Sequence, residues 1–301
     1  MLIEKYYSNG KLLLTGEYLV LDGAVSLALP TKYGQDLTVE EIVPPFLIWE
    51  SFDENGVLWF YSKFELPGLK SDSHDKITST LSNILKEAQN LNPKFLSDDF
   101  GYKIKTKLSF PKNWGLGTSS TLINNVAEWA EVDAFELLKN SFGGSGYDIA
   151  CAQNNSPILY QLKNNKPSVE TVYFDPHFKS QLYFIHLNKK QDSKEGIKNY
   201  KNARRNSVDF VKDISNISLQ LLNCTELSEF DRLLLEHERI IASILKKNPV
   251  QQELFSDYFG QTKSLGAWGG DFILATGNNN TPNYFKNKGF ETVIPYQDMI
   301  L

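Results

Sequence analysis

The stretch from Pro111 to Ser120 reads Pro-Lys-Asn-Trp-Gly-Leu-Gly-Thr-Ser-Ser. It follows an alternating segment, residues 102–110, that is typical of a β-strand, and it precedes a helical pattern at residues 121–129. Glycine lets the backbone approach an anion closely, and the N–H groups and dipole of a helix N-terminus favour phosphate. The stretch therefore predicts a strand, a phosphate-binding turn and a helix in succession.

Two other nucleotide-binding turns and a plain helix cap compete with this interpretation. A Walker loop needs Lys followed by Ser or Thr directly after its last glycine, and the sequence contains no such string. A Rossmann turn needs Gly-x-Gly-x-x-Gly, but Ser120 replaces the third glycine and Lys-Asn-Trp lengthens the turn. A well-capped helix would explain part of the stretch, since Thr118 and Ser119 are of the residue types that cap helices.

The composition indicates a globular protein that acts on neither nucleic acid nor membranes. A chain of 301 residues with 41% hydrophobic residues can bury a large core and reaches the length at which cores divide in two. A net charge of -5 argues against nucleic acid, whose binding depends on clustered Lys and Arg. Cys151 and Cys224 lack metal-ligand spacing and are expected in the core. With neither a signal peptide nor a run of about 18 apolar residues, we expect a cytoplasmic protein.

The hydrophobic pattern predicts an α+β fold with two domains, residues 1–175 and 176–301, that meet at the Asp175-Pro176 turn. The helix expected at residues 75–88 places Ile77, Leu81 and Ile84 on one face. Helical patterns also occur at 121–129, 132–142, 208–222 and 227–245. Strand patterns occur at 11–15, 25–29, 37–42, 57–61, 102–110, 158–162, 169–174, 182–187, 272–276 and 291–294.

Three further strings stand far from the central turn. The first, Ser8 to Leu21, contains Gly-Lys followed five residues later by Gly-Glu, and the second, Lys263 to Asp271, reads Lys-Ser-Leu-Gly-Ala-Trp-Gly-Gly-Asp. Together with the central turn, the first two strings resemble the three signature motifs of the GHMP kinases, the superfamily of galactokinase, homoserine kinase, mevalonate kinase and phosphomevalonate kinase. The third string, Gly-Ser-Gly-Tyr-Asp-Ile-Ala at residues 144–150, is similar to that of a GHMP subgroup known by Gly-Tyr-Asp-Ile-Ala.

This resemblance implies a fold and a set of site residues. The fold would be a domain of the ribosomal-protein-S5 domain-2 type packed on a ferredoxin-like C-terminal domain, with the active site between them. ATP phosphates would be bound by Gly115, Leu116, Gly117, Thr118, Ser119 and Ser120, with Ser119 reaching Mg²⁺. The substrate side would include Glu17, Ser145 and the C-terminal glycine loop of Gly266, Ala267, Gly269 and Gly270.

The resemblance also implies two catalytic residues, Asp148 beside the acceptor hydroxyl and Lys11 approaching it from the N-terminal strand. An aspartate next to a lysine stays ionised and can accept a proton, while the cation stabilises charge on the moving phosphoryl group. Structural interpretations stand beside these: a helix cap or surface carboxylate for Asp148, a surface lysine for Lys11, and a structural hydrogen bond for Glu17.

A carboxylate that completes the magnesium site is harder to place. The resemblance favours Glu136, on the helix before the aspartate motif, but the spacing is irregular, so Glu128, Glu131 and a merely solvated helix face remain open. The histidines indicate no metal site, because His237-Glu238 lacks the second His four residues later that a zinc-protease helix needs.

We therefore expect an ATP- and Mg²⁺-dependent kinase that phosphorylates a hydroxyl or phosphate of a small acid, mevalonate or phosphomevalonate being favoured. Its partner would be a small molecule, and the protein a monomer or homodimer. One alternative is a GHMP-fold protein that binds nucleotide or metabolite without turnover, because Tyr18 replaces the usual His and Trp268 enters the glycine loop. Another is a different GHMP kinase, such as a homoserine or sugar kinase.

Overall fold

The computed structural model describes residues 3–73, 75–191, 193–203 and 207–301, which form a mixed α+β structure with two β-sheets. The predicted α+β class is confirmed. Backbone contacts divide the chain into two compact units. Of the described residues, unit 1 contains those up to 10, 33–112 and 116–153, and unit 2 contains 11–32, 113–115 and those from 154 onward. The continuous domains expected at residues 1–175 and 176–301 remain a prediction.

The sheet of unit 1 has the strand order β4-β3-β5-β2, with β1 paired to β2. Strand β3 runs parallel to β5, whereas the β3–β4 and β2–β5 pairs are antiparallel. Strands β1 and β2 also contribute residues to unit 2. The strand bounds are β1 (Ile3–Leu13), β2 (Ser26–Ile42), β3 (Phe46–Phe52), β4 (Leu58–Glu65) and β5 (Gly101–Leu108).

The strands of the N-terminal region differ from the predicted ones. Residues 25–29 and 37–42 belong to one long strand, β2, rather than to two. Gly34, which lies between the two predicted strands, permits a close approach inside β2: a Cβ there would lie 2.3 Å from the Ser8 carbonyl oxygen. Strand β3, which follows Pro44-Pro45, was not predicted, although its residues alternate between buried and half-buried positions as a strand should.

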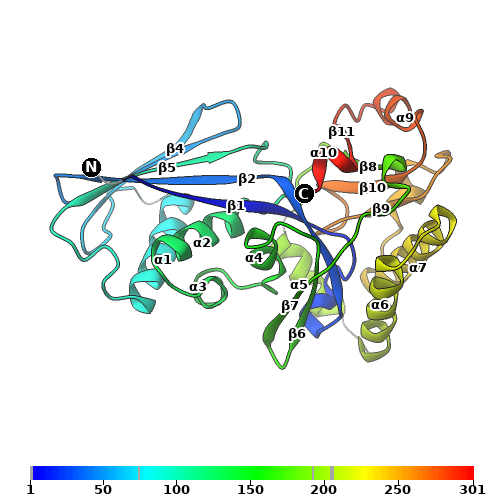
Figure 1. The fold of residues 1–301 in the computed structure, drawn as a ribbon, viewed down its shortest axis with the longest axis horizontal. Coiled ribbons are helices and arrows are strands. Elements are labelled where there is room, and N and C mark those ends of the chain that lie inside the picture. Colours follow the sequence, from blue (N-terminus) through cyan, green and yellow to red (C-terminus); the bar gives the residue numbers. More distant parts are fainter. Residues whose placement is uncertain (1–2, 74, 192, 204–206) are drawn as a thin grey trace. The chain divides into compact units, whose positions relative to one another are not determined.

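Four helices of unit 1 lie on one side of its strands (Figure 1). They are α1 (Lys76–Leu91), α2 (Thr118–Trp129), α3 (Ala134–Ser141) and α4 (Tyr147–Ala152). Helix α1 begins where predicted because the Asp75 carboxylate accepts hydrogen bonds from the backbone N–H groups of Ile77 and Thr78. Leu81 and Ile84 are buried as the periodicity predicted, but Ile77, which was expected on the same face, is 48% exposed.

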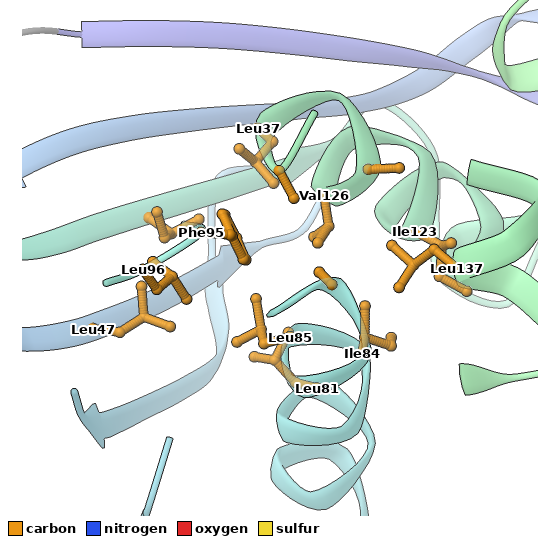
Figure 2. Close-up of a cluster of buried hydrophobic side chains, with 14 of the residues drawn as sticks. Leu37, Leu47, Leu81, Ile84, Leu85, Phe95, Leu96, Ile123, Val126 and Leu137 are labelled. Atoms are coloured by element: carbon orange, nitrogen blue, oxygen red, sulfur yellow. The ribbon is translucent and has the colours of Figure 1, made fainter. Parts of the chain in front are cut away.

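The core of unit 1 forms where these helices meet the sheet. Figure 2 shows side chains from both layers directed into one interior. They include Leu37 and Leu47 from strands β2 and β3, and Leu85 from α1, each fully buried. Val126 and Ile123 bring α2 into the same cluster, so the glycine-rich turn that precedes α2 is anchored to a packed core.

Unit 2 contains a second sheet with the order β11-β8-β10-β9, in which all described pairs are antiparallel. Its strands are β8 (Leu182–His186), β9 (Thr262–Ser264), β10 (Phe272–Thr276) and β11 (Val293–Pro295), while β6 (Ile158–Lys163) and β7 (Lys166–Thr171) extend the start of β2. Strand β7 thus begins earlier than the strand expected at residues 169–174.

Two helices of unit 2 match the predicted amphipathic segments, and the others were not predicted. The two long ones, expected at 208–222 and 227–245, are α6 (Ser207–Leu222) and α7 (Leu227–Leu245). The others are α5 (Ser193–Ala203), α8 (Val250–Leu254), α9 (Thr281–Asn287), α10 (Tyr296–Met299) and two short 3-10 helices, η1 (Leu19–Asp22) and η2 (Lys179–Gln181). Among the described helices, none combines the length and apolarity needed to cross a membrane.

Leu85→Ala tests the core of unit 1. Leu85 is fully buried in the cluster, so its truncation should lower the free energy of unfolding by about 2–5 kcal/mol. Ile77 lies on the same helix with 48% of its surface exposed, and Ile77→Ala should change stability by no more than about 0.5 kcal/mol. Urea unfolding followed by circular dichroism measures both, and equal effects of the two changes would contradict the described packing.

Candidate functional site

The glycine-rich turn has the backbone geometry of an anion-binding helix start. Gly115 and Gly117 have positive φ angles of 69° and 97°, a region that other residues enter with difficulty. Gly117 is the N-cap of α2, and no side chain caps the helix there. The first N–H groups of α2 are thus left without a side-chain acceptor, and they suit a negatively charged ligand.

The three hydroxyl residues after Gly117 differ in their surroundings. Ser120 is buried, and its hydroxyl donates to the Gly117 carbonyl oxygen at 3.0 Å. Thr118 is half-buried, whereas Ser119 is exposed. Among these three side chains, Ser119 is therefore the most accessible to a ligand.

A buried polar network supports α2 from within unit 1. Asn124 donates to the Ser8 hydroxyl at 2.9 Å, and that hydroxyl donates to the Asn125 amide oxygen at 2.7 Å. Gln153, the residue after α4, donates to the Asn124 amide oxygen at 2.9 Å. Because buried polar groups are costly unless bonded, this network holds α2, α4 and β1 in one arrangement.

Asp148 lies in the first turn of α4, a short helix that packs against α2. Its N-cap, Gly146, has a φ of 87°, so a glycine is required to begin the helix directly after the loop. Asp148 is half-buried, and Ser145 precedes the same helix. Unit 1 therefore joins Asp148 to the second half of the glycine-rich turn through the α2–α4 contact.

Lys11 belongs to unit 2, together with Gly115. Its ammonium donates a hydrogen bond to the Gly115 carbonyl oxygen at 2.9 Å. The segment 113–115 is held in the same unit by two contacts: the Asn113 carbonyl oxygen lies 3.2 Å from His186 Nε2, and the Trp114 ring meets the Phe272 ring edge-on at 5.4 Å. The predicted catalytic lysine thus directly contacts the first glycine of the predicted phosphate-binding turn.

Glu17 is buried inside unit 2. Its carboxylate forms an ion pair with the Lys263 ammonium, and both side chains are fully buried. The backbone N–H of Gly16 donates to His237 Nε2 at 3.0 Å, so that nitrogen acts as an acceptor and the ring is neutral. Burial, aided by Lys263, lowers the pKa of His237 accordingly. The structural alternative for Glu17 fits this geometry, and its contact with substrate remains a prediction.

A second carboxyl group, Glu238 of α7, shares this interior. Burial raises its pKa to about 8, because the loss of hydration outweighs the attraction of Lys263. The pKa of Glu17 is raised to about 7 for the same reason. One buried ammonium therefore faces two carboxyl groups, and the three side chains are neutral together when one carboxyl group is ionised and the other is protonated.

The C-terminal glycine loop lies between β9 and β10 in unit 2. Gly266 and Gly269 have φ angles of 63° and 89°, a region that glycine adopts readily. The Ala267 carbonyl oxygen accepts a hydrogen bond from the Tyr18 hydroxyl at 2.8 Å. Trp268, the departure from an all-small loop, is buried, and Gly269 is exposed.

The predicted metal ligand Glu136 lies exposed in the first turn of α3 in unit 1, and its backbone N–H donates to the Asp133 carboxylate at 2.9 Å. Its rival Glu128 accepts from Asn124 at 2.9 Å, and burial raises the pKa of Glu128. Across the part of the chain that the structure describes, no group of three His, Cys, Asp or Glu side chains could hold a metal ion. The choice among these carboxylates remains a prediction.

Four titratable residues near these elements were not assigned by sequence reasoning. Asp271 is the last residue of the glycine-loop string, and its carboxylate packs against the Cα of Gly115. Lys263, His237 and Glu238 build the interior around Glu17. A signal existed for His237 and Glu238, because two ionisable residues interrupt the apolar face of a predicted helix, but a motif search for metal sites passes over such a pair.

Comparisons with known proteins identify the fold. No protein-family model and no curated protein matches the sequence. Solved structures do match: Methanococcus jannaschii mevalonate kinase has a TM-score of 0.71 at 16% identity, with 96% of each chain covered. The chain has the GHMP kinase fold.

Two further GHMP kinases illustrate how widely this fold is matched. Streptococcus pneumoniae phosphomevalonate kinase, in complex with phosphomevalonate and AMPPNP, gives a TM-score of 0.69 at 15% identity over 96% of each chain. A D-glycero-D-manno-heptose 1-phosphate kinase from Bacteriodes thetaiotaomicron gives 0.69 at 15% identity over 99% of this chain and 96% of its own. The fold predicted from the three motifs is confirmed, and it is shared by kinases that act on different acceptors.

The buried carboxyl groups of this GHMP fold predict how stability depends on pH. A carboxyl whose pKa is higher when folded binds more protons in the native state, so stability falls as the pH rises from about 4.5 to about 8. Glu238→Gln removes one such group and should make this fall smaller. Urea unfolding at pH 5.5 and pH 8 measures the difference.

The matched control for this experiment is Glu236→Gln, at an exposed position on the same helix. This variant should retain the pH dependence of the wild type. If Glu238→Gln shows the wild-type fall in stability, Glu238 does not titrate in this range when buried.

Proposed function

We propose that this chain is an ATP-dependent kinase that transfers the γ-phosphoryl group to a hydroxyl or phosphate of a small acid, with mevalonate or phosphomevalonate as the favoured acceptor. In this proposal the residues from Gly115 to Ser120 bind the ATP phosphates, Asp148 accepts a proton and Lys11 neutralises charge.

The observation that carries it is the N-terminus of α2. A helix of twelve residues starts at Gly117 without a side-chain cap, and its first N–H groups therefore lack that partner. Within unit 1 these backbone N–H groups are followed by the exposed Ser119 hydroxyl, and within unit 2 the Lys11 ammonium donates to the Gly115 carbonyl oxygen. A helix N-terminus favours phosphate through its free N–H groups and its dipole, and an ammonium favours it through charge.

In this proposal Mg²⁺ would act as a partner of the nucleotide rather than as a resident ion. Since the described residues hold no group of three metal-ligating side chains, a protein cage is not available among them. Mg²⁺ commonly keeps several waters and binds substrate phosphates with one or two protein oxygens. Ser119 would supply one such oxygen and Glu136 another, and the ion would neutralise phosphate charge during transfer.

Asp148 and Lys11 would divide the remaining chemistry. As the acceptor oxygen bonds to the γ-phosphorus, the bond to the bridging oxygen of ADP breaks, and Asp148 takes the hydroxyl proton. Lys11 would stabilise the negative charge on the transferring group. An acceptor phosphate is already ionised at neutral pH, so it would need no base, and Asp148 would then matter less.

The acceptor is inferred from sequence motifs rather than from the fold. The Gly-Lys and Gly-Glu spacing near the N-terminus and the Gly-Tyr-Asp-Ile-Ala string favour mevalonate or phosphomevalonate. The heptose-phosphate kinase has nearly the same structural similarity as the mevalonate kinase, so the fold itself does not favour an acid over a sugar.

An ADP-release assay tests the proposal directly. The purified protein would be given Mg-ATP with mevalonate, phosphomevalonate, homoserine, galactose or a heptose phosphate, and ADP would be measured by a coupled assay. We expect release with one of the two mevalonate compounds. Release with a sugar alone would correct the acceptor. Tight ATP binding without release on any acceptor would overturn the kinase proposal in favour of a binding protein.

Asp148→Ala tests the assignment of the base. If the acceptor is an alcohol, loss of the base should lower kcat by roughly 10²–10⁴-fold, with a smaller change in KM for ATP. Asp99→Asn, an exposed carboxylate of the same unit, is the matched control and should leave kcat unchanged. Normal turnover of an alcohol by Asp148→Ala would refute the assignment.

A further inference from the structure

Gly115 lies beside two opposite charges in unit 2. On one side its carbonyl oxygen accepts the hydrogen bond from the Lys11 ammonium at 2.9 Å. On the other side its Cα is covered by a carboxylate: a Cβ at Gly115 would lie 2.4 Å from Asp271 Cγ and 2.5 Å from Asp271 Oδ2. The positive φ and this contact both require a glycine at position 115. Lys11 and Asp271 therefore approach the same residue.

The backbone on both sides of Asp271 holds its side chain in place. Its N–H donates to the Lys189 carbonyl oxygen at 2.6 Å, and its own carbonyl oxygen accepts from the Leu187 N–H at 2.8 Å. The Gln191 N–H donates to Oδ1 at 3.3 Å. Asp271 adopts a φ of 54°, a left-handed conformation that Asp tolerates better than most residues. The carboxylate is thus fixed against Gly115 by the segment that follows β8.

Burial and charge act on this carboxylate in opposite directions. Asp271 is only 9% exposed, and burial raises its pKa. Three cationic or titratable neighbours, Lys11, Lys190 and His186, oppose that rise, and Lys11 has the largest effect among them. The ammonium that binds the Gly115 carbonyl is therefore also the main counter-charge of Asp271.

We propose that Asp271 is a positioning residue for Lys11, which together with the Gly115 carbonyl oxygen holds the ammonium charged and in one place beside the predicted phosphate-binding turn. A lysine side chain has four rotatable bonds, and an ammonium held by a single acceptor can still turn about it. A second, negative neighbour restricts that freedom. The catalytic consequence rests on the proposed kinase function, but the approach of both residues to Gly115 does not.

The alternative is that Asp271 only shapes the end of the glycine loop. Both roles predict that removal of Asp271 disturbs the loop, so stability and activity alone do not separate them. Only the positioning role predicts that the chemical state of Lys11 depends on the charge of residue 271. The decisive measurement therefore reads Lys11 itself.

The labelling rate of Lys11 measures its chemical state. The protein is acylated with an amine-reactive ester at pH 8 without nucleotide, and the labelled peptide is quantified by mass spectrometry. Only the neutral amine reacts, and removal of an opposite charge within about 6 Å favours the neutral form by roughly tenfold or more. Asp271→Asn keeps the shape and an Oδ1 acceptor for Gln191, and it should raise the Lys11 labelling rate about tenfold. Asp271→Glu retains the charge and should remain near the wild-type rate.

Asp257→Asn provides the matched control, because Asp257 is an exposed carboxylate of the same unit whose partners are Tyr284 and Lys288. Its Lys11 labelling rate should equal that of the wild type. Equal labelling of the wild type and Asp271→Asn, or the same increase in Asp271→Glu, would overturn the proposal.

A double-mutant cycle covers the case in which Asp271→Asn folds poorly. Urea midpoints would be measured for Lys11→Met, Asp271→Asn and the double variant. If the charges support each other, the double variant loses less than the sum of the single losses, and it folds even where one single variant does not. Additive losses, or a double variant that fails to fold, would count against the proposal.

These measurements stand apart from the kinase assay. If no acceptor leads to ADP release, the proposed function fails, while the labelling and the cycle still test the Lys11–Asp271 relation. If the enzyme is active, Asp271→Asn should lower kcat more than it raises KM for ATP, since a misplaced cation affects the moving phosphoryl group most.

Discussion

The site depends on a close approach of chain segments at Gly115. A single glycine accepts the Lys11 hydrogen bond on its carbonyl oxygen and the Asp271 carboxylate on its Cα, while its φ of 69° turns the chain toward α2. Any other residue would meet Asp271 and strain the backbone at once. The polypeptide passes from unit 2 to unit 1 directly after this residue.

A binding site at the start of α2 needs exposed hydrogen-bond donors and a rigid support, and unit 1 supplies both. The first turn of α2 leaves backbone N–H groups without a side-chain cap, which destabilises a helix end unless a ligand or water binds there. The stability of the helix must therefore come from elsewhere. It comes from the apolar contacts of Ile123 and Val126 and from the buried network of Ser8, Asn124 and Gln153. This arrangement suits a binding site, because the scaffold does not rely on the groups that face the ligand.

Unit 2 contains charged and titratable side chains in an apolar interior. Lys263 is buried with Glu17 and Glu238, and both carboxyl groups have raised pKa values because they have lost their hydration. His237 stays neutral and accepts the Gly16 N–H, which fixes the backbone immediately before Glu17. These residues connect the N-terminal motif, α7 and β9. The Gly-Glu of the motif thus has a structural role that its sequence alone does not reveal.

Local patterns in the sequence determined much of this protein. The apolar periodicity of α1, α6 and α7, the strand–glycine–helix succession around Gly117 and the order of the three motifs predicted the α+β class and the GHMP kinase fold. These features depend on residues close together in the chain, whose spacing states which face is buried. The strand β3 and the continuity of β2 escaped prediction, because Pro44 and Gly34 indicate turns locally while their true surroundings are set by neighbouring strands.

Only the tertiary structure decided which charged residues meet. Lys263 is separated from Glu17 by 246 positions, and Asp271 is far in sequence from both Lys11 and Gly115. No local spacing encodes such pairs, since burial and ion pairing arise when distant segments pack together. The sequence by itself determined that a glycine-rich turn would precede a helix in a kinase-like fold. The packing of unit 2 decided that Lys11 and Asp271 would both reach Gly115, because only tertiary contacts bring together residues so far apart in the chain.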